Sequence, residues 1–105
     1  MSKVEFTIGW VAWVDHMPQS SKSFHIRGSV MAKHPGHEAL MKRCEPQGIN
    51  PKELLMELEL KELPGNWPQV VTNIPVVYEE EHYNGDHATV KVINHDIRIE
   101  VQIVQ

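Results

Sequence analysis

Residues 50–65, NPKELLMELELKELPG, decide the fold class, because their end signals and their internal pattern disagree. The ends are typical of a helix, with a cap, a proline, a capping-box glutamate and a terminator at Asn50, Pro51, Glu53 and Gly65. Inside, the pattern is that of a strand with one buried face: Leu54, Met56, Leu58 and Leu60 alternate with Leu55, Glu57, Glu59 and Lys61. We predict a strand from about Leu54 to Glu62, and a helix over residues 50–63 is the alternative.

The same period of two recurs along most of the chain. It predicts strands over Val4–Val14 and Phe24–Lys33, which we expect to pair, and a three-stranded meander over Val76–Tyr83, Asp86–Ile93 and Ile97–Val104. The predicted fold class is therefore mainly β: an antiparallel β-sandwich or partly open barrel of six to seven strands. If residues 50–63 were helical, the class would be α+β.

One short helix is expected between the second strand and the deciding segment. Residues 34–44, HPGHEALMKRC, place Pro35 at a candidate first helical position, and strong helix formers follow from Glu38 to Arg43. We predict about two helical turns here.

Length and composition narrow the functional classes. A chain of 105 residues is expected to form a single globular domain over residues 1–105. Its lone cysteine, Cys44, cannot form an internal disulfide, which favours a reducing, cytoplasmic setting. The net charge of −4 gives no reason to expect a nucleic-acid partner, and no apolar run is long enough to predict a membrane span.

An Asn-Gly pair at residues 84–85 predicts a two-residue hairpin turn between the strands that flank it. In that register His82 faces His87, and Glu80 lies on the same face two residues earlier. Two imidazoles and a carboxylate are a plausible ligand set for a transition metal, with Zn²⁺ as the obvious candidate.

Two further imidazoles, His34 and His37 in the HPGH segment, could complete such a metal site. The alternative interpretation is that these histidines are solvated side chains whose affinity for protons is raised by the glutamates at 79–81. A third is a pH-sensitive hairpin tip, since two close imidazoles resist double protonation while the glutamates favour it. No cofactor is required by the sequence, and zinc or another transition metal remains the candidate.

Two tryptophans are candidates for an interface or ligand site. Trp13 and Val11 place apolar side chains on the wet face of the first strand, which suits a subunit interface, or packing beneath a covering helix. Trp67, in the proline-flanked PGNWPQ loop, suits a sugar or other small ligand, or packing beneath the loop.

Motifs for common catalytic sites, such as a glycine-rich phosphate loop, GxSxG or HExxH, do not occur. The leading hypothesis is therefore a non-enzymatic binding or interaction domain, with a protein partner or a second copy of itself. A metal-binding protein or metal-dependent enzyme is the first alternative. A carbohydrate- or small-ligand-binding β-domain is the second.

Overall fold

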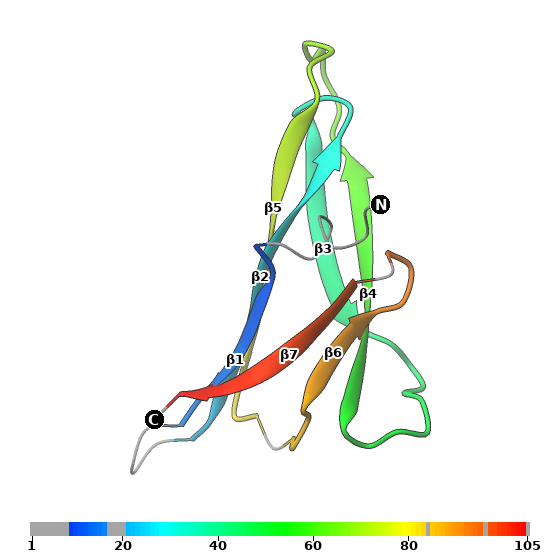
Figure 1. The fold of residues 1–105 in the computed structure, drawn as a ribbon. Helices are drawn as coiled ribbons and strands as arrows, with labels where there is room; N and C mark the ends of the chain where they lie inside the picture. Colours follow the sequence, from blue (N-terminus) through cyan, green and yellow to red (C-terminus); the bar gives the residue numbers. More distant parts are fainter. Residues whose placement is uncertain (1–8, 17–20, 84, 96, 105) are drawn as a thin grey trace.

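A computed structural model describes residues 9–16, 21–83, 85–95 and 97–104, which form a mainly β structure. Seven strands make up one mixed sheet that curves until it is nearly a closed barrel (Figure 1). No described segment forms a helix long and apolar enough to cross a membrane. The strands are β1 (Val11–Asp15), β2 (Ser23–Ala32), β3 (His37–Arg43), β4 (Glu53–Glu62), β5 (Thr72–Glu81), β6 (Thr89–Val92) and β7 (Ile97–Val104).

The strand order is β3-β4-β6-β7-β1-β2-β5, so β3 and β5 are the two edge strands. Four neighbouring pairs are antiparallel, and the pairs β1–β7 and β4–β6 are parallel. The edge strands approach one another without being neighbours in the hydrogen-bonded order. Side chains therefore have to complete the barrel wall where the backbone ladder stops.

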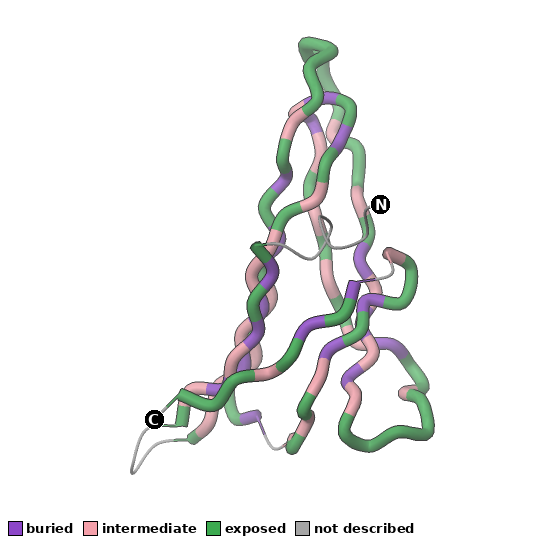
Figure 2. Tube along the Cα trace, viewed as in Figure 1, coloured by how far each residue is buried: buried purple, intermediate pink, exposed green. Residues whose placement is uncertain are grey.

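The core lies inside this barrel, where the inward side chains of all the long strands meet. Figure 2 shows the resulting alternation of buried and exposed positions along the strands. Phe24 and Ile26 from β2, and Val90 and Val92 from β6, have no exposed surface. Removing this apolar surface from water is the main favourable contribution to folding.

The deciding segment is a strand, as its alternation predicted. Leu54, Met56 and Leu58 of β4 are buried with exposures of 0–1%. The helix-like signals at its start serve a turn instead: the side-chain Oδ1 of Asn50 accepts a hydrogen bond from the Lys52 amide at 3.0 Å. Asparagine favours such turns as readily as helix caps, so the end signals alone did not specify a helix.

The short helix predicted within residues 34–44 is wrong, because His37–Arg43 forms strand β3. Its register with β4 pairs Ala39 with Leu60 and Met41 with Leu58, so alternate side chains face the core. An isolated two-turn helix is marginal even with good helix formers. A full ladder with β4 therefore overrides the local preference.

The pairing of the first two predicted strands is confirmed by the antiparallel β1–β2 ladder. The predicted start of the first strand, residues 4–8, lies outside the described residues. The meander is wrong in one connection: β5 pairs with β2, whereas β6 pairs with β4 and β7. The segment around Gly85 thus joins two strands that are not neighbours, and Asn84 itself lies outside the described residues.

Candidate functional sites

An aromatic and charged group surrounds Trp13 on the outer side of the barrel. The β1–β2 register sets Trp13 opposite His25, and the two rings stack with centroids 4.8 Å apart and planes inclined by 17°. The guanidinium carbon of Arg27 lies 5.4 Å from the centroid of the Trp13 ring, which is within cation–π range. No described helix covers Trp13. Its ring is held in place by the neighbouring side chains of His25 and Arg27 on β2.

Glu79 on β5 fixes the two β2 side chains that contact Trp13. It lies opposite His25 in the β2–β5 register, accepts a hydrogen bond from Arg27, and lies 3.4 Å from His25 Nδ1. The hydrogen bond from Arg27, with a further one from His25, holds the pKa of the Glu79 carboxyl below its usual value. These contacts therefore hold four side chains in fixed positions relative to one another: Trp13, His25, Arg27 and Glu79.

Two exposed valines flank this group. Val11 and Val77 lie on either side of Arg27 in one cross-strand row, with exposures of 46% and 56%. We call the set of six outward side chains the Trp13 face; it consists of Val11, Trp13, His25, Arg27, Val77 and Glu79.

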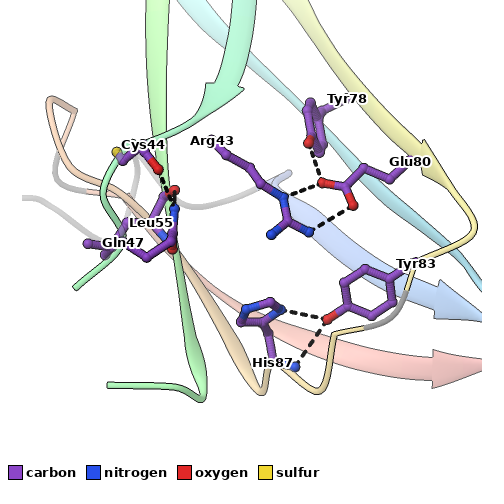
Figure 3. Close-up of polar contacts among 8 residues, drawn as sticks. All are labelled: Arg43, Cys44, Gln47, Leu55, Tyr78, Glu80, Tyr83 and His87. Atoms are coloured by element: carbon purple, nitrogen blue, oxygen red, sulfur yellow. Dashed lines mark hydrogen bonds and ion pairs between the residues drawn. The ribbon is translucent and has the colours of Figure 1, made fainter. Parts of the chain in front are cut away.

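Inside the barrel, a polar group joins the two edge strands (Figure 3). Arg43 of β3 donates two hydrogen bonds to the carboxylate of Glu80 on β5, one of them from Nη2 to Oε1 at 2.8 Å. The Tyr78 hydroxyl donates to the same carboxylate. Such a two-point contact between a guanidinium and a carboxylate is both directional and charge-assisted.

The shifts in pKa follow from burial and from this pairing. Burial, followed by the Glu80 carboxylate, raises the pKa of Tyr78 to about 12. Burial alone would raise the pKa of Glu80 too, but the hydrogen bonds from Arg43 and Tyr78 outweigh it and keep that pKa below its usual value. Glu80 and Arg43 are therefore a charged pair at neutral pH.

A second pair, Tyr83 and His87, lies close to this ion pair (Figure 3). The Tyr83 hydroxyl accepts a hydrogen bond from the backbone amide of His87 at 3.1 Å and lies 2.7 Å from its Nδ1. Burial, followed by the positive charge of Arg43, lowers the pKa of His87. The imidazole is therefore neutral at pH 7, and its Nδ1 shares a hydrogen bond with the Tyr83 hydroxyl.

The structure does not bring the predicted ligands His82, His87 and Glu80 together as a cross-strand set. Since β5 and β6 are not paired, His82 does not face His87. His82 is an exposed residue just beyond β5 with a positive φ of 59°. Glu80 and His87 contact Arg43 and Tyr83 instead.

A different cluster contains the two other predicted ligands. His34, His37 and Glu62 each offer one ligand atom, and these atoms lie within 4.8 Å of one another. Sequence reasoning named both histidines but missed Glu62. The signal that could have found it is the register of β3 with β4, in which His37 lies opposite Glu62.

Trp67 packs against the turn that holds these histidines. Its indole lies so close to Gly36 that a Cβ on that glycine would be 2.2 Å from it. The indole Nε1 donates a hydrogen bond to the carbonyl of Leu63 at 3.2 Å. One side of the ring and its polar atom are therefore already engaged within the chain.

Comparisons with protein-family models, with curated proteins and with solved structures found no match.

Proposed function

We propose that this protein is a small, non-enzymatic interaction domain that associates with a second copy of itself through the Trp13 face. The observation that supports the proposal is the arrangement of Trp13, stacked on His25 and beside Arg27 on an outward surface. Tryptophan and arginine are enriched among the residues that dominate binding energy at protein interfaces. Side chains that are already ordered lose less conformational entropy on binding.

Charge supports a second copy as the partner. The Trp13 face holds the cation of Arg27 beside the carboxylate of Glu79. A two-fold axis through such a face sets the same surface against itself, so that each charge can meet its opposite on the other copy. The exposed Val11 and Val77 would then be buried along with the indole of Trp13.

The Trp67 loop is less suited to the small-ligand hypothesis. A sugar-binding aromatic needs an open face on which the ring of the ligand can stack, whereas Trp67 already lies against Gly36.

We also propose a reducing, cytoplasmic setting for the protein, because Cys44 is a buried free thiol whose pKa is raised by burial.

Sedimentation velocity over a range of protein concentrations tests the proposal. The wild type should form dimers, and Trp13→Ala should weaken self-association by about 2 kcal/mol or more, which is about 30-fold. Leu40→Ala is the matched control, because Leu40 is an exposed apolar residue on β3, a strand that contributes no residue to the Trp13 face. It should leave the dimer intact.

A wild type that stays monomeric up to several hundred micromolar would contradict self-association and direct the search to another protein partner. Equal effects of Trp13→Ala and Leu40→Ala would also contradict the assignment to the Trp13 face.

A further inference from the structure

His34, His37 and Glu62 form a cluster where the turn at Pro35 and Gly36 meets strands β3 and β4. The β3–β4 register sets His37 directly opposite Glu62, so their side chains share a face of the sheet. The turn at Pro35 and Gly36 folds His34 back onto the same place, with ring centroids of the two histidines 4.3 Å apart. His34 is buried, at 5% exposure, whereas Glu62 is exposed.

The proton positions of His37 suit a metal ligand. Its Nδ1 lies 3.0 Å from the backbone carbonyl of His34, and a carbonyl can only accept, so Nδ1 carries the proton. In the neutral ring the lone pair is then on Nε2. Histidine ligands in metal sites usually donate their other N–H to a carbonyl or carboxylate in this way, which fixes the tautomer and the ring orientation.

Glu62 offers a carboxylate oxygen to the same site. This oxygen lies 3.0 Å from Nε2 of His34, and carboxylate oxygens are established zinc ligands.

His34 needs one rearrangement. Its Nδ1 accepts a hydrogen bond from the Gly36 amide at 3.1 Å, so the proton of the neutral ring is on Nε2 and points at Glu62. For Nε2 to bind an ion, that proton has to leave and Nδ1 has to take one up. The Gly36 amide then loses its acceptor and has to turn away.

We propose that His34 Nε2, an imidazole nitrogen of His37 and a carboxylate oxygen of Glu62 bind one transition-metal ion of the Zn²⁺ class. Two imidazoles and one carboxylate are a ligand set that zinc uses, with a fourth, open position for water. Binding requires no net loss of a proton from His34, because the proton that leaves Nε2 is replaced by one on Nδ1.

The position of Gly36 connects this site to Trp67. The Gly36 carbonyl accepts a hydrogen bond from the Leu63 amide at 2.8 Å, and the Trp67 indole lies against the Gly36 Cα. A change at the Gly36 amide should therefore alter the surroundings of Trp67 as well.

The experiment uses tag-free protein titrated with Co²⁺, whose visible absorption reports coordination by nitrogen and oxygen ligands, followed by displacement with Zn²⁺. The variants are His37→Gln and Glu62→Gln, because truncating the buried His34 could unfold the chain. His82→Gln is the matched control, since it removes an exposed histidine outside the cluster. Circular dichroism checks that each variant is folded.

One Co²⁺ per chain, displaced by Zn²⁺ and weakened on the order of 100-fold or more by each cluster variant, would support the site. The control should bind as the wild type does. In ¹⁵N-labelled protein, the Gly36 amide resonance should shift on addition of Zn²⁺, and so should the Trp67 indole resonance.

No binding at micromolar concentrations would overturn the proposal. Binding that survives His37→Gln and Glu62→Gln, or that disappears in His82→Gln, would place the ion elsewhere and overturn it too. A Gly36 amide that does not shift on Zn²⁺ binding would exclude the role of His34.

Discussion

Arg43 and Glu80 form a two-point ion pair between β3 and β5, the two strands that the hydrogen-bonded ladder leaves unjoined. Their side chains are 33% and 21% exposed, so the pair is largely withdrawn from water. The contact takes the place of a backbone ladder at the seam of the barrel. Its strength should therefore decide how firmly the barrel is closed.

The effects of removing the two partners of this ion pair on stability should not be additive. Arg43→Met leaves the Glu80 carboxylate partly buried with only Tyr78 as a partner, and we expect it to destabilise the fold by about 1–3 kcal/mol. The double variant Arg43→Met/Glu80→Met should be less destabilised than the sum of the two single variants. Urea unfolding of all four proteins measures this coupling. Additive effects would mean that the pair contributes nothing to closing the seam.

Stability should fall in acid because of Glu80. Its folded pKa is lower than the ordinary value of 4.5, so the unfolded chain takes up a proton at a higher pH than the folded chain does. The stabilisation is complete above about pH 4.5 and is lost as the pH falls through the lower folded pKa. Urea unfolding between pH 7 and pH 3 should show a smaller decline for Glu80→Gln than for the wild type. The exposed Glu59→Gln is the control; if it flattens the profile equally, Glu80 is not the source.

Most of the strands could be predicted because alternation along a strand follows directly from burial of one face. This explains the success for β2 and for β4, whose inward residues Leu54, Met56 and Leu58 are the buried ones. The order of the strands could not be obtained in the same way. Alternation says which face of β5 is buried, but it does not say that β5 pairs with β2 rather than with β6.

Strand order, which the alternation does not reveal, also decides which candidate site residues meet. Asn84-Gly85 is a strong local hairpin signal, but the long-range pairing of β5 with β2 separates His82 from His87. Conversely, His37 and Glu62 are 25 positions apart and meet only because residues 37–43 form a strand paired with β4. The helix that the sequence predicts for this segment would not place His37 opposite Glu62.

Gly28 on β2 should not tolerate even one additional carbon. A Cβ there would lie 2.2 Å from the side chain of Trp10, which is buried at 7% exposure. We expect Gly28→Ala to destabilise the fold by about 2 kcal/mol, because a packed core responds to overpacking with strain. Calorimetry should show a Tm lower by roughly 8–16 °C.

The neighbouring Ser29→Ala is the control for this prediction, since Ser29 is exposed on the same strand. Adding Trp10→Phe to Gly28→Ala should recover part of the loss by making room. A Tm for Gly28→Ala within 2 °C of wild type, on the order of the scatter for a neutral change, would show that Trp10 does not pack there.

Tyr83→Phe isolates the hydroxyl from the ring. The ring stacks on Phe24 with centroids 5.0 Å apart, and phenylalanine can keep that contact. The hydroxyl, in contrast, accepts a hydrogen bond from the His87 amide and shares another with His87 Nδ1, and both groups would lose a partner in a largely buried place. We expect a loss of about 1–2 kcal/mol in the free energy of unfolding, measured by urea at pH 7.5, where His87 is neutral. At that pH the double variant Tyr83→Phe/His87→Leu should lose less stability than the two single variants together, because it removes Nδ1 along with its hydrogen-bond partner. A Tyr83→Phe protein as stable as the wild type would show that water replaces the hydroxyl at His87, and that Tyr83 contributes only through its ring.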